Sequence, residues 1–263
     1  MNIQESLDDA QDLTCLYASR APNTGMSQEK ITAKIQNLPE KLQGIDLDGM
    51  LVYDLQDESS RTSIPRPFPY VPSIEPRVYA SEIQKVLNKQ VITSKAVAHL
   101  SPDTFEEWLN VTADQYKLNN LILIGGVSSS QEISLPLETA YSLVRKIKPE
   151  MKLGGIVITE RHIKKQDEHI RMMNKTKSGC TFFVTQVLYN PDSIIKLIHD
   201  YDQLCIQNKE RPKKVCLTFS LCSCEKMLSF MEWLGVDVPA EFKARLKNAE
   251  VMIKESTKIN IEN

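Results

Sequence analysis

The sequence lacks any apolar run of about 18 residues, the length from which a membrane-spanning helix would be inferred. Its first residues show no secretory pattern of a basic segment, an apolar segment and a cleavage site. Excess charge of one sign is also lacking, because 32 Lys and Arg oppose 34 Asp and Glu, a net charge of −2. We therefore expect a cytoplasmic protein with no nucleic-acid and no membrane partner.

Cysteine patterns that bind metal are lacking as well. The six cysteines lie mostly in apolar stretches, which suits reduced, buried thiols in a cytosolic protein. Cys216, Cys222 and Cys224 are close in the sequence, but neither a second CxxC pair nor a histidine partner accompanies them. The sequence therefore predicts no metal site.

The chain does contain a regular alternation of short apolar stretches and amphipathic stretches. The predicted strands span 13–19, 49–55, 91–100, 120–127, 153–159, 180–189 and 214–220. The predicted helices span 27–42, 76–89, 102–116, 135–147, 163–178, 191–207, 223–234 and 239–257. Apolar strands separated by helices are typical of a parallel sheet covered on both faces, and no GxGxxG motif follows the first strand. We predict an α/β fold, a (β/α)8 TIM-type barrel, as a single domain over 1–263.

Two features interrupt this alternation. Residues 55–75 form a long loop with four prolines, and loops of that length are often functional. After the seventh predicted strand the sequence contains only helical patterns, so the last strand of the barrel is predicted to be lacking or truncated. We expect that a second copy or a partner protein completes such a barrel.

Polar residues follow several of the predicted strands. In a parallel barrel, the chemistry gathers at these C-terminal strand ends. Singly, each residue also has a structural explanation, such as a buried histidine for His99 or a local ion pair for Glu160 with Arg161. Their shared position predicts one site. The residues are Tyr53, Asp54, Asp57, Glu58, His99, Gly125, Gly126, Glu160, His162 and Gln186.

Gln186 is unusual because it lies in the second half of a strand that is otherwise largely apolar. A carboxamide both donates and accepts hydrogen bonds, which suits a heterocycle with alternating donors and acceptors. The sequence therefore predicts that Gln186 points into the mouth of the barrel and binds a ligand.

Several stretches resemble the methylenetetrahydrofolate reductase family. They are "AHLSPDT" (98–104), "LILIGGVSS" (121–129), "GGIVITERHIKKQDEHIRMMNKTKSGC" (154–180), "GCTFFVTQVLYNPDS" (179–193) and "CLTFSLCSCEKMLSFMEWLGVDVP" (216–239). The runs "DLQDE", "ERH" and "WLGV" resemble a divergent bacterial branch for which flavin-independent activity has been described.

The resemblance implies an eight-stranded α/β barrel that reduces 5,10-methylenetetrahydrofolate to 5-methyltetrahydrofolate. NAD(P)H would supply the hydride, either directly or through FAD. Gln186 matches the folate-binding glutamine of the family, and we expect Tyr53 beside the folate. The predicted cofactor-binding residues are His99, Gly125, Gly126, Glu160, His162, Arg171 and Lys175.

The sequence departs from the family at two positions that matter for chemistry. Ala18 stands where the family has a glutamate in its first strand, and Val127 stands near the place of an aspartate. Opening the folate ring requires an acid within hydrogen-bond reach. We predict Glu58 as this acid, with Asp57 or Asp54 as substitutes, because burial under the proline-rich loop would raise the carboxyl pKa.

Two other functions remain open from the sequence. The chain would be a degenerate, non-catalytic folate-binding barrel if the lost glutamate and last strand abolish turnover. It would act on a different pterin or one-carbon carrier, with a methyltransferase partner, if the pocket has changed its ligand. Competition between 5-methyltetrahydrofolate and other pterins separates these readings.

Overall fold

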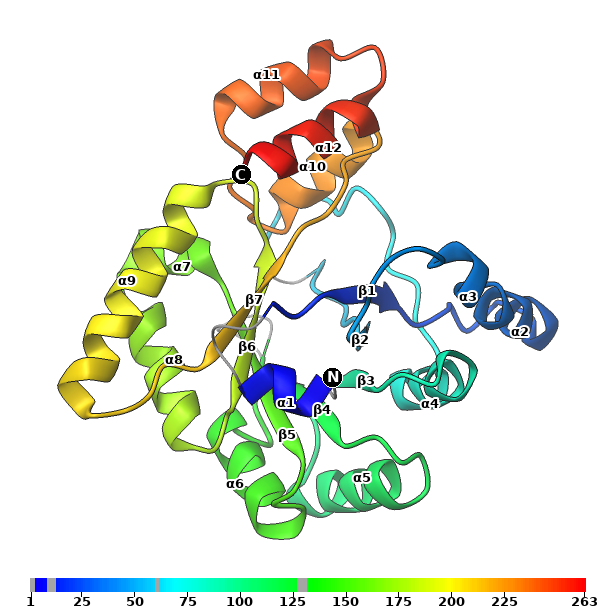
Figure 1. The fold of residues 1–263 in the computed structure, drawn as a ribbon, viewed down its shortest axis with the longest axis vertical. Helices are drawn as coiled ribbons and strands as arrows, with labels where there is room; N and C mark the ends of the chain where they lie inside the picture. Colours follow the sequence, from blue (N-terminus) through cyan, green and yellow to red (C-terminus); the bar gives the residue numbers. More distant parts are fainter. Residues whose placement is uncertain (1–2, 9–12, 60–61, 127–131) are drawn as a thin grey trace. The chain divides into compact units, whose positions relative to one another are not determined.

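The computed structural model describes residues 3–8, 13–59, 62–126 and 132–263. Seven strands form one sheet in the order β1 to β7 (Figure 1). They are β1 Leu16–Arg20, β2 Gly49–Tyr53, β3 Val91–Ala96, β4 Asn120–Ile124, β5 Lys152–Val157, β6 Phe182–Val187 and β7 Lys214–Thr218. The pairings from β1 to β5 are parallel, for example Ala18 with Leu51 and Val52 with Thr93. The fold is therefore that of a TIM-type barrel with seven strands in the described part of the chain, as predicted.

Apart from α1, which precedes β1, the helices follow the strands in sequence. They are α1 Ile3–Asp8, α2 Gln28–Gln36, α3 Leu38–Lys41, α4 Pro76–Leu87, α5 Pro102–Asp114, α6 Leu137–Ile147, α7 Thr159–Lys165, α8 Glu168–Lys177, α9 Pro191–Asn208, α10 Glu225–Trp233, α11 Ala240–Asn248 and α12 Met252–Glu262. α5 and α9 begin as their sequences predict, since Ser101 and Asn190 accept the N–H groups of Thr104 and Asp192.

Some predicted boundaries were wrong. The predicted helices 27–42, 163–178 and 239–257 each contain a break and form two helices. The second break comes from Gln166, whose left-handed backbone at φ 55° ends α7. α7 also begins earlier than predicted, at Thr159, so Glu160 and His162 lie on a helix. β3 ends at Ala96, which places His99 in the following turn.

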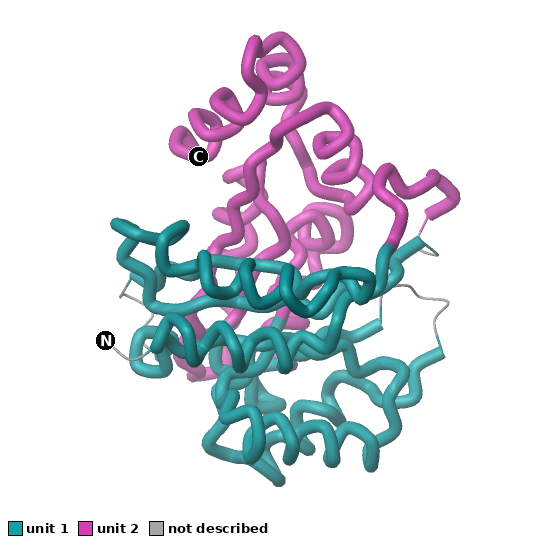
Figure 2. Tube along the Cα trace, turned by 90° about the vertical axis from the view of Figure 1, so that its right-hand side faces the viewer, with its two compact units in different colours: residues 1–61, 71–155, 175–182 teal, residues 62–70, 156–174, 183–263 magenta. Residues whose placement is uncertain are grey.

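The chain divides into two compact units, coloured separately in Figure 2. Unit 1 comprises residues 1–61, 71–155 and 175–182, and unit 2 comprises residues 62–70, 156–174 and 183–263. A single domain over 1–263 stays a prediction.

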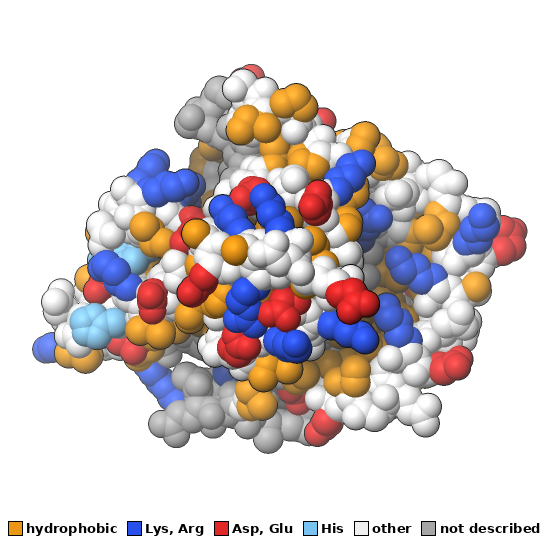
Figure 3. Space-filling view, turned by 90° about the horizontal axis from the view of Figure 1, so that it is seen from above, with side chains coloured by type: hydrophobic (Ala, Val, Ile, Leu, Met, Phe, Trp, Pro, Cys, Tyr) orange, Lys and Arg blue, Asp and Glu red, His pale blue; other side chains and the backbone are white. Residues whose placement is uncertain are grey.

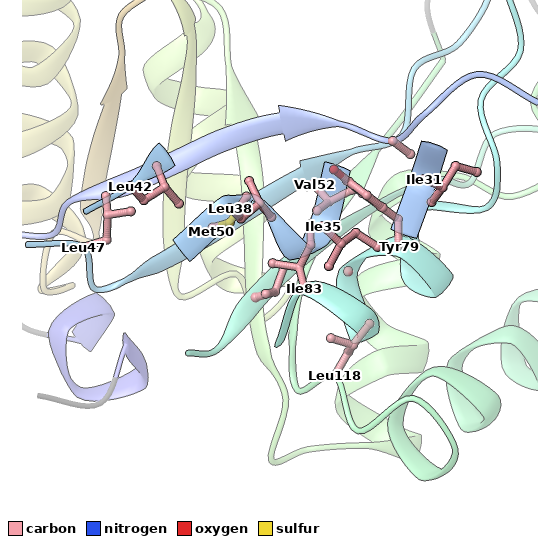
Figure 4. Close-up of a cluster of buried hydrophobic side chains, with 13 residues drawn as sticks. Ile31, Ile35, Leu38, Leu42, Leu47, Met50, Val52, Tyr79, Ile83 and Leu118 are labelled. Atoms are coloured by element: carbon pink, nitrogen blue, oxygen red, sulfur yellow. The ribbon is translucent and has the colours of Figure 1, made fainter. Parts of the chain in front are cut away.

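The core of unit 1 follows from the two-residue period of its strands. Met50 and Val52 of β2 project from the same face and pack against Ile35, Tyr79 and Ile83 of α2 and α4 (Figure 4). Burying a side chain of this size contributes about 1.5–3 kcal/mol. This packing fixes the position of β2, and thereby of the residues that follow it.

The core of unit 2 lies around Tyr189, which follows β6. Tyr189 is buried with Leu228, Met231 and Leu246 from α10 and α11. Its hydroxyl donates to the carbonyl oxygen of Ser220 at 2.8 Å. The hydrogen bond satisfies the polar tip of a fully buried ring and ties the end of β6 to the segment after β7.

Candidate functional site

In unit 1, Asp54 directly follows β2 and is held by β3 at two points. Its backbone N–H donates to Ser94 Oγ at 2.5 Å, and its Oδ2 accepts the N–H of Ala96 at 2.8 Å. Burial raises the pKa of Asp54, while the Ala96 N–H and the charge of Lys95 act in the opposite direction. The result is a half-buried carboxyl group that keeps its proton to higher pH than an exposed aspartate.

A cluster of charged and aromatic side chains lies beside this strand end, and the sequence reading missed it. Lys95 is buried on β3 and forms an ion pair with Glu75 at 3.3 Å. Trp108 Nε1 donates to Glu75 Oε1 at 2.8 Å. The signal was present in "VITSKA", since a lysine inside an otherwise buried strand needs a partner.

The other predicted acids lie further along the same loop. Asp57 is exposed, and its Oδ1 accepts the N–H and hydroxyl of Ser59 at 3.0 and 2.5 Å. Glu58 is half-buried, and so is Tyr53, the last residue of β2. Their roles as acid and folate contact stay predictions.

Four predicted cofactor residues also belong to unit 1. His99 and Gly126 are exposed, after β3 and β4 respectively. A Cβ at Gly125 would approach Leu137 no closer than 3.7 Å, so packing does not require glycine there. Lys175 is buried on α8, and its Cδ would lie 3.2 Å from a Cβ at Gly155. The aliphatic part of the Lys175 side chain therefore packs against Gly155 of β5 instead of lying on the surface.

In unit 2, Gln186 occupies β6 as predicted and is half-buried. Its Oε1 accepts the N–H of Val187 at 3.1 Å. The amide nitrogen Nε2 is therefore the group that can donate a hydrogen bond to a ligand. The preceding residue, Thr185, points to the other side of the strand and accepts the N–H of Thr218 at 2.9 Å. The threonine thus fixes β6 against β7, while the glutamine is presented from the opposite face.

Glu160 is buried at the start of α7. Its Oε1 accepts the N–H of Asp237 at 3.1 Å, and its Oε2 accepts the hydroxyl of Thr159 at 3.2 Å. Both carboxylate oxygens therefore contact protein groups. A carboxylate in the first turn of a helix is also favoured by the helix dipole.

His162, two residues later, has no exposed surface. Its Nε2 lies 2.9 Å from Asp200 Oδ2 of α9, and its ring packs edge-to-face on His169 at 5.1 Å. Hydrogen bonds from Lys196, His162 and His199 hold the pKa of Asp200 below its ordinary range. Because protein atoms surround the ring, we leave His162 out of the ligand set proposed below.

Arg171 is exposed on α8, and its Nε lies 3.3 Å from Glu168 Oε2. The buried Glu168 also accepts the N–H of Ile158 at 3.4 Å. Arg171 therefore helps to compensate a buried carboxylate, and its phosphate-binding role stays a prediction.

Residues 62–70 of the proline-rich loop pack against α10. The guanidinium of Arg66 lies over the rings of Phe230 and Trp233 at 4.9 and 5.5 Å, and Nη1 donates to the carbonyl oxygen of Phe68 at 2.7 Å. Trp233 Nε1 donates to the carbonyl oxygen of Ile64 at 2.9 Å. These cation–π contacts and hydrogen bonds hold the loop on α10.

The molecular surface shows no bias of charge on the face in Figure 3, where acidic and basic side chains of the described residues intermingle. Among the described helices, none has the length and apolar character to cross a membrane. The described part of the chain also contains no group of three or more metal-ligating side chains.

Comparison with solved structures gives a strong match. An uncharacterized protein from Clostridium thermocellum that binds two copies of 5-methyl-5,6,7,8-tetrahydrofolic acid is 27% identical, with a TM-score of 0.82 over 98% of this chain and 84% of that chain. A phosphonopyruvate hydrolase matches at 11% identity and a TM-score of 0.52, covering 99% and 94% of the two chains. A 2,3-dimethylmalate lyase matches at 8% and 0.52, covering 98% and 93%. The last two likenesses show the fold alone.

Comparison with curated protein sequences finds no match. The family model "Methylenetetrahydrofolate reductase" matches residues 127–263, more than half of the 263 residues. The match includes β6 with Gln186 and the α7–α9 segment. The chain belongs to the methylenetetrahydrofolate reductase family.

Proposed function

We propose that this protein binds a reduced folate and reduces 5,10-methylenetetrahydrofolate to 5-methyltetrahydrofolate with hydride from NAD(P)H. The observation that carries the proposal is the similar Clostridium protein, which binds 5-methyltetrahydrofolic acid, the product of this reaction. The family membership of the chain supports the same reaction type.

Gln186 is proposed to bind the pterin. Its position on β6, half-buried and oriented through Val187, supports this role because the amide is held in one orientation before a ligand arrives. A preorganised amide loses less conformational entropy on binding than a mobile one.

Asp54 is proposed as the acid that opens the five-membered folate ring. Protonation of one ring nitrogen breaks its bond to the bridging carbon, and the iminium ion left on the other nitrogen accepts the hydride. Asp54 supports this role better than the exposed Asp57, because burial raises its pKa and the Ala96 N–H engages only Oδ2. The proton is then carried on Oδ1. Glu58 is the alternative acid.

The residues predicted to bind FAD do not fit that cofactor well. Both oxygens of Glu160 accept protein hydrogen bonds, His162 has no exposed surface, and Arg171 pairs with Glu168. These contacts support direct hydride transfer from the nicotinamide to the folate. A cytoplasmic location, and a second copy or partner that completes the barrel, stay predictions.

The test is NADH or NADPH oxidation that depends on 5,10-methylenetetrahydrofolate, with 5-methyltetrahydrofolate identified chromatographically. We expect turnover by a purified protein whose spectrum lacks flavin absorption. Turnover that requires added FAD would contradict the direct route, and folate-independent oxidation would contradict the proposed substrate.

A non-catalytic folate-binding protein is the second candidate. It is favoured by Ala18, which lies on β1 opposite Leu51 and supplies no acid where the family has a glutamate. Binding of 5-methyltetrahydrofolate without any nicotinamide oxidation, over a range of pH, would establish this function instead.

A further inference from the structure

The cluster beside Asp54 combines two cations, a carboxylate and an indole ring, and apolar packing alone does not require these charges. Lys95 Nζ lies 3.4 and 3.3 Å from the two oxygens of Glu75, and 5.2 Å from the Trp108 ring centroid. Arg77 Nε lies 3.8 Å from Glu75 Oε1, and its Nη1 donates to the carbonyl oxygen of Trp108 at 2.8 Å. Glu75 is therefore shared by two cations and one indole N–H.

The same strand segment holds Asp54. Ser94 and Ala96, the residues on either side of Lys95, make the two hydrogen bonds to Asp54. Since neighbouring side chains of a strand point to opposite faces, Lys95 projects away from Ser94, toward Glu75 before α4 and Trp108 on α5. Asp54 and the ion pair are thus connected through three consecutive residues of β3, of which Ala96 contacts the carboxylate.

We propose that Lys95 and Glu75 are positioning residues that set the protonation of Asp54. This inference rests on the proposed function, in which Asp54 donates a proton. Lys95 stabilises the ionised Asp54, and Glu75 counteracts Lys95, which favours the protonated form of Asp54. Neither residue touches the folate in this scheme.

The charged groups that act on Asp54 in unit 1 are few. Lys95 lies on β3, Glu75 precedes α4, and His99 lies in the turn after β3. The pKa of Asp54 is lowered by the charges of Lys95 and His99 and raised by that of Glu75. Arg77 acts through its contact with Glu75.

The test measures the Asp54 carboxyl pKa by carbon-13 NMR in the ligand-free protein, with Asp54→Asn to assign the resonance. Glu75→Gln leaves Lys95 uncompensated, so we expect the pKa to fall by roughly 0.5 to 1 unit. Lys95→Met removes the cation, so we expect the pKa to rise by a similar amount. A loss of packing would shift the Asp54 pKa in the same direction in both variants. Shifts of opposite sign therefore indicate the charges of Glu75 and Lys95.

The matched controls are Glu82→Gln and Lys85→Met, which break an exposed ion pair on α4. They should leave the Asp54 pKa unchanged. An unmoved pKa in both cluster variants, or shifts in the same direction, would overturn the proposal. Should Lys95→Met fail to fold, Glu75→Gln decides alone, because glutamine keeps an acceptor for the Trp108 N–H.

Turnover separates this inference from the proposed function. If both variants shift the NMR pKa as expected and the pH profile of turnover moves with it, both are supported. If the NMR pKa moves and the turnover profile stays fixed, Asp54 is not the acid, and the role of the ion pair in proton donation is overturned with it.

Discussion

The two units each contain an aspartate whose pKa departs from its ordinary value, and the two departures have opposite signs. In unit 1, burial raises the pKa of Asp54, which accepts a hydrogen bond from the Ala96 N–H. In unit 2, Asp200 accepts hydrogen bonds from Lys196, His162 and His199, which lower its pKa. A carboxyl group that contacts cations directly stays ionised, whereas one whose main perturbation is burial keeps its proton to higher pH, against the opposing effect of the Ala96 N–H.

The comparison therefore separates two kinds of polar cluster. The cluster on α7–α9 contains three of the four histidines of the chain, and two of them, His162 and His199, lie within hydrogen-bond distance of Asp200. The strand end at Asp54 instead holds a half-buried carboxyl group whose pKa is raised by burial. A count of histidines favours the α7–α9 cluster, whereas the raised pKa supports the proposal of Asp54 as the acid.

The largest expected effect is from Asp54→Asn. Loss of the acid should reduce turnover by roughly 10²- to 10⁴-fold, while the affinity for 5-methyltetrahydrofolate changes little. Steady-state kinetics and calorimetric titration measure the two quantities. Asp57→Asn, on the exposed part of the same loop, is the control and should keep nearly full activity. An equal loss of turnover in both variants would contradict the choice of Asp54 over Asp57 as the acid.

Gln186→Ala should weaken folate binding. Two neutral hydrogen bonds of about 1 kcal/mol each correspond to roughly 30-fold in the dissociation constant. Titration of 5-methyltetrahydrofolate measures the change, and the exposed Gln207→Ala on α9 is the matched control. Unchanged affinity in Gln186→Ala would show that unit 2 does not provide the pterin contact.

His162→Ala should affect stability instead of chemistry. Truncating a fully buried ring that contacts Asp200 and His169 should cost about 2 to 4 kcal/mol. Urea unfolding measures the loss, and turnover per folded molecule should be unchanged. The exposed His199→Ala should cost little by comparison; a selective loss of cofactor affinity in His162→Ala would return this residue to the ligand set.

The smallest effect concerns the pH dependence of stability. The folded-state pKa of Asp54 is raised, so its stabilising contribution is full below the ordinary carboxyl pKa and is lost as pH rises through the folded value. Asp54→Asn should therefore be more stable than the natural protein near neutral pH, and the difference should close in acid.

Asp200→Asn provides the opposite sign. The lowered pKa of Asp200 gives a contribution that is present above the ordinary carboxyl pKa and is lost as pH falls. The substitution should destabilise the protein near neutral pH, with the difference again closing in acid. Urea unfolding at several pH values checks both variants, and shifts of equal sign would refute the contrast between the two aspartates.

Much of the architecture was predictable from the sequence. All seven strands were found because their apolar character is continuous and helices separate them. The helix breaks were missed, since the left-handed conformation of Gln166 has no glycine or proline to announce it. Boundary errors of a few residues then placed His162 at a strand end, when the structure buries it inside a helix cluster.

The site was predictable in part. Gln186 stood out because it interrupts an apolar strand, and the structure keeps it on β6. The proposal of Asp54 in place of Glu58 could not be made from the sequence, because it depends on hydrogen bonds to Ser94 and Ala96 from another strand. Residues separated by about 40 positions in the sequence carry no local signal of such contact.

The pH dependence of folate reduction tests the central claim most directly. If a buried, protonated Asp54 is the acid, turnover of the natural protein falls as pH rises through the raised pKa of this residue, and the weak residual activity of Asp54→Asn shows no such fall. An Asp54→Asn variant with the rate and pH profile of the natural protein would contradict the account.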